Sequence, residues 1–139
     1  MDLHQALGQE WAQLQHDHEQ YERSGLLIKL LAVVLCLACM ALGFDALWLA
    51  PVLLMLWLQE GIYRAFQSRL SARLLRVEQA LAQGTTATAR AFQLHSDWLA
   101  TRPGTVGLIR EYLSNAARPT VAFPYVLLLA LSLLYQYGP

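Results

Sequence analysis

The sequence predicts an all-α integral membrane protein: a long two-span helical hairpin with a cytoplasmic coiled-coil-like stalk, plus a third transmembrane helix. Of the 139 residues, 56% are hydrophobic and only 14% are charged, whereas about a quarter of the residues of a soluble domain are charged. The formal net charge is zero, which would leave a soluble surface prone to association. The charges are also unevenly distributed: residues 30–59 hold only Asp45, and residues 119–139 hold none. A free soluble monomer is therefore not expected.

Residues 1–24 are expected to form a cytoplasmic acidic amphipathic helix. This segment contains five acidic side chains and a single basic one, Arg23. Large side chains recur every three or four residues, which is the period of one helix face, at Leu3, Leu7, Trp11, Leu14, His18 and Tyr21. A signal peptide would be an alternative explanation of the apolar run that follows, but such peptides begin with a short basic region.

Residues 25–66 are expected to form a two-span transmembrane hairpin. A helix needs about 20 mostly apolar residues to cross a hydrocarbon core of ~30 Å. Residues 26–44 and 47–66 both meet this requirement. Asp45 lies between them, at a position where its side chain suits a turn.

Residues 67–119 are assigned to a cytoplasmic basic helix and connector. Beyond the second span the helical period continues as far as the breaker Gly84-Thr85-Thr86, at Tyr63, Phe66, Leu70, Leu74, Val77 and Leu81. The simplest arrangement is two continuous helices, about 3–44 and 47–83, folded back on each other.

The remainder of the chain predicts two short helices and one span. Residues 89–100 and 106–117 are expected to be helical, separated by the turn signal Arg102-Pro103-Gly104. Residues 120–139 are assigned to the third transmembrane helix, whose apolar run covers 121–137.

The basic residues that follow the second span have two possible partners. They can pair with the acidic N-terminal helix in an antiparallel stalk, or they can lie on anionic lipid. The residues in question are Arg64, Arg69, Arg73 and Arg76. Pairing within one chain is favoured, because the two segments carry opposite charge.

The distribution of basic residues predicts the orientation, since Lys and Arg concentrate in short cytoplasmic connections. Eight of the ten lie between the second and third spans, namely Arg64, Arg69, Arg73, Arg76, Arg90, Arg102, Arg110 and Arg118. We therefore expect a multi-pass protein of the inner (plasma) membrane, with a cytoplasmic N-terminus and an external C-terminus.

Small residues in the first span predict close helix packing. Ala32, Cys36, Cys39 and Gly43 recur on one helix face, and small residues at such spacing let helices approach closely. This stripe is expected to be a helix-packing or oligomer interface. A metal or cofactor site there would need more ligands than the two cysteines.

Other candidate sites are weaker. His16 and His18 lie about 200° apart on a helix and cannot share a metal. Glu60 has Arg64 one turn later, which suits an i,i+4 ion pair, and Lys29 can extend to the headgroups from the first span. No catalytic residue, cofactor or metal is predicted. The expected partners are the lipid bilayer and a membrane protein or further copies of the chain, and no nucleic acid.

Residues 51–70 carry a resemblance. An apolar run ends in Trp57 and is followed by an acid, aromatic residues and arginines, at Glu60, Tyr63, Arg64, Phe66 and Arg69. In this the chain resembles a loosely defined group of small three-span bacterial inner-membrane proteins, some of which look like accessory or effector proteins in defence systems. The resemblance implies the three-span layout and no particular activity.

Three functions remain open at this point. We favour a non-enzymatic inner-membrane scaffold or accessory subunit that anchors or assembles a partner complex. The alternatives are an oligomerising pore-forming membrane effector and a subunit of a membrane enzyme whose site forms only in the complex. The sequence contains no nucleophile or phosphate-binding motif, which argues against an active site within the chain. It also has no ionisable residue in the middle of a span, which argues against a transporter.

Overall fold

A computed structural model describes residues 2–83 and 91–139, and within them the chain is helical and has no strand. The helices are α1 (Leu3–Leu42), α2 (Ala46–Gln83), α3 (Leu94–Thr101), α4 (Thr105–Ala116) and α5 (Pro119–Tyr137). Of these, α1, α2 and α5 are long and apolar enough to cross a membrane. The structure thus confirms the prediction of an all-helical chain with three candidate membrane spans.

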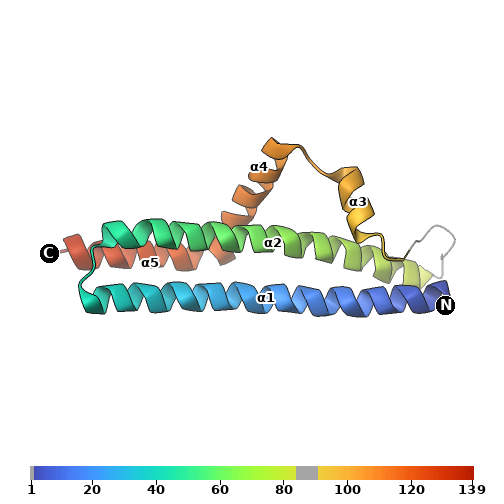
Figure 1. Ribbon diagram of the computed structural model, residues 1–139, viewed down its shortest axis with the longest axis horizontal. Coiled ribbons are helices and arrows are strands. Elements are labelled where there is room, and N and C mark those ends of the chain that lie inside the picture. Colours follow the sequence, from blue (N-terminus) through green and yellow to red (C-terminus); the bar gives the residue numbers. More distant parts are fainter. Residues whose placement is uncertain (1, 84–90) are drawn as a thin grey trace.

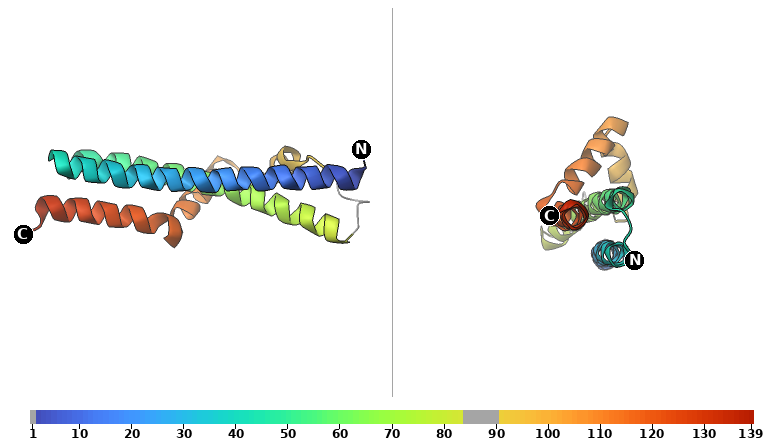
Figure 2. Two further views of the ribbon diagram at one scale, coloured as in Figure 1. Left: turned by 90° about the horizontal axis from the view of Figure 1, so that it is seen from below. Right: turned by 90° about the vertical axis from the view of Figure 1, so that its left-hand side faces the viewer.

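The two long helices run antiparallel and side by side, and α5 lies along the half of α2 that is nearest their turn (Figure 1). Seen from the end, α1, α2 and α5 stand at the corners of a triangle (Figure 2). With 40 residues in α1 and 38 in α2, each is about 60 Å long at 1.5 Å per residue. This is twice the ~30 Å thickness of a hydrocarbon core, which the 19 residues of α5 match alone.

The turn between α1 and α2 is closed by its own residues. Gly43 adopts a left-handed conformation with φ 71°, which glycine accepts without steric penalty and which ends the helix. Asp45 Oδ1 accepts a hydrogen bond from the Leu47 N–H at 2.8 Å and so caps α2. The Ala46 N–H donates to the side-chain oxygen of Gln136, which connects the turn to the end of α5.

Two separate groups of apolar side chains hold the long helices together. The span cluster packs α1, α2 and α5 around Ala32, Cys36, Leu49, Leu53, Tyr125 and Leu128. The stalk cluster packs the other halves of α1 and α2 around Leu7, Leu14, Leu70, Leu74 and Val77. The apolar residues that recur at helical spacing in residues 3–21 thus pack against those that recur in residues 63–81.

The outer faces of the three long helices are apolar around the span cluster. Leu37 on α1 is 60% exposed, Met55 on α2 is 73% exposed and Phe123 on α5 is 68% exposed. Soluble proteins rarely leave so much contiguous apolar surface uncovered. A hydrocarbon environment removes the cost of that exposure, which fits a multi-pass membrane protein.

Helices α3 and α4 form an arch beside α2, which we call the arm (Figure 1). The C-terminal end of α4 packs closely against α2 because Gly61 of α2 has no side chain. A Cβ at Gly61 would lie 2.7 Å from Ala116 Cβ, which is shorter than van der Waals contact. Trp57 Nε1 donates to the Ala116 carbonyl at 2.8 Å and fixes the same point.

We expect Gly61→Ala to destabilise the protein even though alanine is the better helix former. The added methyl group must displace α4, and overpacking of this kind costs about 1–3 kcal/mol. Gly8→Ala is the matched control, since nothing lies within 4 Å of a Cβ at that position. There the change should stabilise the helix by about 0.5–1 kcal/mol. Unfolding monitored by circular dichroism in mild detergent measures the change in stability of both variants. Stabilisation by Gly61→Ala would contradict the close contact between Gly61 and Ala116.

The third helix begins later than the sequence predicts. It starts at Leu94 instead of residue 89, and Phe92 has a φ of 58°, which a right-handed helix cannot contain. The breaker Gly84-Thr85-Thr86 and Arg90 lie outside the described residues. The predicted 106–117 helix is observed as α4, which begins and ends one residue earlier, and the predicted 121–137 helix is observed as α5, which begins two residues earlier and ends at the predicted residue.

Candidate functional site

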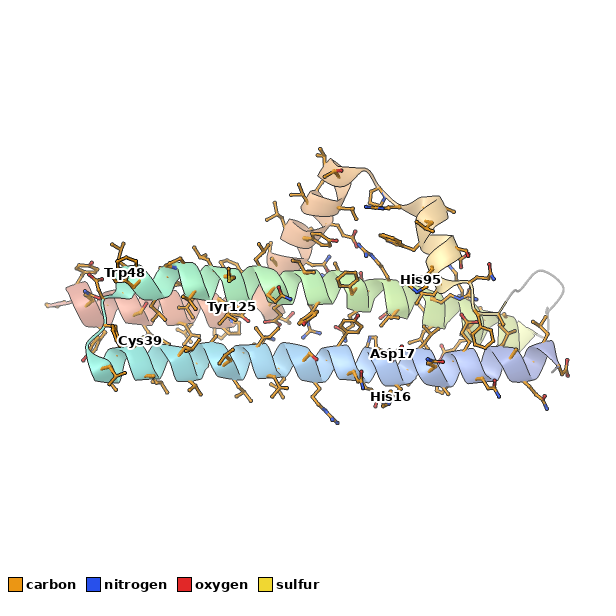
Figure 3. The ribbon with its side chains drawn as sticks, viewed as in Figure 1. His16, Asp17, Cys39, Trp48, His95 and Tyr125 are labelled. Atoms are coloured by element: carbon orange, nitrogen blue, oxygen red, sulfur yellow. The ribbon has the colours of Figure 1, made fainter. Side chains whose placement is uncertain are left out.

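A fully buried carboxylate lies where α1, α2 and α5 meet. Glu60 has an exposed fraction of 0%, and its Oε1 lies 3.0 Å from Lys29 Nζ of α1. Its Oε2 accepts a hydrogen bond from the Tyr125 hydroxyl of α5 at 2.9 Å. Each of the three long helices thus contributes one of these residues, which we call the span network. Figure 3 labels Tyr125, whose ring lies between the long helices.

Neighbouring contacts orient the members of the span network. Lys29 Nζ also donates to the Thr120 carbonyl at the start of α5, at 3.2 Å. The Tyr125 ring stacks on Trp57, with centroids 6.1 Å apart and planes 6° apart. Because Trp57 also holds the end of α4, the network connects the three spans to the arm.

Arg64 is the second cation near Glu60, and it is the more distant one. Its Nε lies 3.8 Å from Glu60 Oε1, while its guanidinium donates to Gln67 Oε1 at 2.7 Å. The sequence predicted the Glu60–Arg64 pair from its spacing, but the structure also brings Lys29 to Glu60, and closer. The reason is the antiparallel packing of α1 on α2, which local spacing does not encode.

A second charged group connects the stalk to the arm. Arg73 of α2 binds both oxygens of Glu10 of α1, from Nε at 2.7 Å and from Nη2 at 3.1 Å. Its Nη1 donates to Asp97 Oδ2 of α3 at 3.0 Å. Glu10 is only 4% exposed, and its Oε2 also accepts the Phe92 N–H at 2.7 Å. We call Glu10, Arg73 and Asp97 the stalk network.

The hydrogen bond to Glu10 raises the pKa of Arg73, and burial acts in the opposite direction. Arg73 stays protonated, because an arginine side chain is charged at every accessible pH even before the hydrogen bond to Glu10 raises its pKa. A bidentate guanidinium–carboxylate pair is directional as well as charged. The stalk network consequently fixes how the arm sits on the stalk.

The other stalk arginines contact the arm. Arg69 pairs with Glu111 of α4 at 3.1 Å, and its guanidinium lies over the Trp98 ring, 4.9 Å from the centroid. Arg76 reaches Asp97 at 3.3 Å. Within the described residues, Arg73 alone among the arginines of α2 pairs with an acid of α1. Charge between the two stalk helices is thus concentrated in one buried pair.

The small-residue stripe lies mostly inside the chain's own packing. Ala32 and Cys36 are buried in the span cluster, and Cys39 is partly buried against it. Cys36 Sγ lies 3.9 Å from the Leu128 carbonyl of α5. Gly43 ends α1 and is exposed. Substituting Ala32 would therefore disturb the packing of one chain before it affected any contact between chains.

The histidine-rich segment of α1 gathers no ligand set. His16 is exposed and its Nε2 lies 3.3 Å from Gln20 Nε2, one turn further on. Figure 3 labels His16 and Asp17 on the stalk half of α1, with His95 on α3. Across residues 2–83 and 91–139, no group of three or more His, Cys, Asp or Glu side chains is placed to hold a metal ion.

Sequence reasoning singled out some members of the two networks but not their partners. It identified Lys29 and Glu60 separately, and it noted Arg73 as basic. Tyr125, Glu10 and Asp97 carried no local signal, because their role depends on the packing of segments distant in sequence. Glu10 and Arg73 each follow an apolar position of their helical period by three residues, but Arg69 does so as well, so the spacing does not single out this pair.

Comparison of the chain with protein-family models, with curated proteins and with solved structures finds no match.

Proposed function

We propose that the protein is a non-enzymatic scaffold or accessory subunit of the inner membrane, whose arm holds a membrane-protein partner on the cytoplasmic side. The observation that carries this proposal is the exposed face of α4. There Val106 is 81% exposed, Ile109 is 53% exposed and Leu113 is 56% exposed. Spacings of three and four residues place these side chains on one helix face.

The opposite face of α4 is already occupied. Leu108, Asn115 and Ala116 are buried, and Ala116 lies against Gly61 of α2. The helix thus buries one side against α2 and leaves an exposed apolar face on the side that faces away. Exposed apolar patches on an ordered element are typical of interaction surfaces.

The arm is also held in place, which favours binding of a partner. Asp97 of α3 pairs with Arg73, and Glu111 of α4 pairs with Arg69. A surface that is already ordered loses less conformational entropy when it binds. The basic residues around α4 support a cytoplasmic location for the arm under the positive-inside rule.

Photocrosslinking in cells tests the proposal directly. A photoreactive amino acid at Val106 or Ile109 of the full chain should give one adduct with a different membrane protein, identified by mass spectrometry. Gln13, which is exposed on α1, is the control position and should give no such adduct. Adducts only with lipid at both arm positions would contradict the scaffold. An adduct of two copies of this chain, together with loss of membrane potential on overproduction, would favour the pore-forming effector instead.

A paired substitution gives a quantitative prediction. Val106→Ser combined with Leu113→Ser should weaken partner binding about thirtyfold, since two apolar anchors at about 1 kcal/mol each contribute about 2 kcal/mol. Recovery of the crosslinked partner, with the photoreactive amino acid at Ile109, should fall accordingly. Surface changes of this kind should alter the free energy of unfolding by no more than ~0.5 kcal/mol. Leu108→Ser is the matched control, because Leu108 is buried on the other face of α4. It should destabilise the protein, so the two faces are distinguished by comparing unfolding with partner recovery.

A further inference from the structure

A polar groove lies where α5 begins, between α1, α2 and α5. Its volume is about 620 Å³. Two of its lining residues are arginines from different elements, Arg64 of α2 and Arg118 of the turn before α5. The Ser68 and Ser71 hydroxyls donate to backbone carbonyls of α2. The other residues that line the groove are His18, Glu22, Gln67, Ser68, Ser71 and Thr120.

The charge of this groove favours an anion. Among its lining residues Glu22 is the acid that opposes Arg64 and Arg118. Arg118 is exposed, and the described part of the chain supplies no carboxylate within ion-pair distance of it. Guanidinium groups bind phosphate through two parallel hydrogen bonds. Arg118 can bind a phosphate group in this way, and Arg64, which also contacts Gln67 and Glu60, adds a second positive charge to the groove.

The depth of the groove fits the headgroup layer. Thr120 lines the groove, and its carbonyl accepts from Lys29 Nζ, so the groove lies level with the ends of the apolar segments of α1 and α5. The charge-free sequence of α5 starts at Pro119. Phospholipid phosphates occupy the layer just outside the hydrocarbon core.

A second, mostly charged depression adjoins the groove. Its volume is about 420 Å³, it shares Glu22 and Arg64 with the groove, and its other lining residues are Glu19, Arg23, Leu26 and Lys29. Leu26 is 57% exposed at the start of the apolar segment of α1. A molecule with its phosphate at Arg118 would thus reach the exposed apolar side chains of α1 at Leu26, beside the charged lining of this depression.

We infer that this groove binds the phosphate group of an anionic phospholipid. Basic pockets between transmembrane helices on the cytoplasmic side recognise anionic headgroups in this way. The inference depends on the three spans crossing a bilayer. It does not depend on the arm or on its partner, so the crosslinking experiment and the lipid experiment can fail separately.

Native mass spectrometry of the full chain in mild detergent tests the inference, with phosphatidylglycerol, phosphatidylcholine and inorganic phosphate as probes. Phosphatidylglycerol should bind at least about tenfold more tightly than phosphatidylcholine. Arg118→Gln should weaken phosphatidylglycerol binding about tenfold, the effect expected for losing one charge-assisted hydrogen-bonded pair. Arg110→Gln is the matched control, because Arg110 is an exposed arginine of α4 that does not line the groove. It should leave the affinity within about twofold of the original value.

Each other outcome would overturn the inference. Equal losses from Arg118→Gln and Arg110→Gln would indicate attraction by overall charge, without a site. Equal binding of phosphatidylcholine would exclude selection of an anionic headgroup. Saturation by inorganic phosphate, with no further gain from phosphatidylglycerol, would assign the groove to a soluble phosphate and not to a lipid. Circular dichroism of both variants should match the original protein, since both side chains are exposed.

Discussion

Replacing Glu60 by methionine is expected to destabilise the protein by about 3 kcal/mol, the lower end of the range for breaking a buried ion pair. The change leaves the Lys29 ammonium without the carboxylate that lies 3.0 Å away. It also leaves the Tyr125 hydroxyl without its acceptor. Lys29 is 22% exposed at its side chain, so part of its charge can be solvated, which is why the lower end applies. Chemical unfolding of the purified protein in mild detergent measures the loss.

A double-mutant cycle separates the ion pair from general damage. Lys29→Met alone should also destabilise, because Glu60 then keeps a buried charge with only the more distant Arg64 nearby. The double variant Lys29→Met with Glu60→Met should recover much of the loss, since replacing both partners by apolar groups is often close to neutral. Glu19→Met, at an exposed acid of α1, is the control and should change stability by less than ~0.5 kcal/mol. Simple addition of the two single effects would show that the pair is not coupled.

Replacing Arg73 by alanine is expected to release the arm from the stalk. Two carboxylates lose their shared partner, and one of them, Glu10, is almost fully buried. We expect a local loss of about 3 kcal/mol, again from breaking a buried pair. This corresponds to roughly a hundredfold faster amide hydrogen exchange in α3, if exchange there proceeds through local opening. Hydrogen exchange with mass spectrometry on peptides covering α3 measures this directly.

Arg76→Ala is the matched control for Arg73→Ala. Arg76 also contacts Asp97, but its side chain is 57% exposed and the distance is 3.3 Å. Exposed ion pairs contribute about 0–1 kcal/mol, so exchange in α3 should rise no more than about fivefold. Equal acceleration by both substitutions would contradict a special role for the stalk network. Acceleration spread evenly over α1 and α2 would show that Arg73 stabilises the whole stalk instead of the arm.

The helices of this protein are readable from its sequence because apolar periodicity and charge-free runs are local properties. The sequence predicted helices of about 3–44 and 47–83, and the structure has Leu3–Leu42 and Ala46–Gln83. Asp45 was expected at a turn and caps α2 through its side chain. The start of α3 was missed, because the left-handed Phe92 has no local signature and depends on the distant Glu10 carboxylate.

The charged networks could not be predicted in the same way. Arg69, Arg73 and Arg76 recur at helical spacing and look equivalent in sequence, yet Arg73 alone faces Glu10. The difference follows from the register of α1 against α2 and from the position of α3. Lys29 and Glu60 are likewise brought together by the register of α1 against α2. The spacing of residues within one helix carries no information about the register between two helices or about the position of α3.

Because α1 and α2 are about twice as long as α5, a tilt of the membrane spans displaces the far ends of the two long helices. The span network lies near the start of α5, and α1 and α2 continue for about 35–40 Å beyond it at 1.5 Å per residue. Transmembrane helices tilt when bilayer thickness changes. If the packed helices tilt as one body about the span network, a tilt of about 10° would displace the far ends of α1 and α2 by ~6–7 Å. A small change in the membrane would thus become a larger displacement in the water beside it.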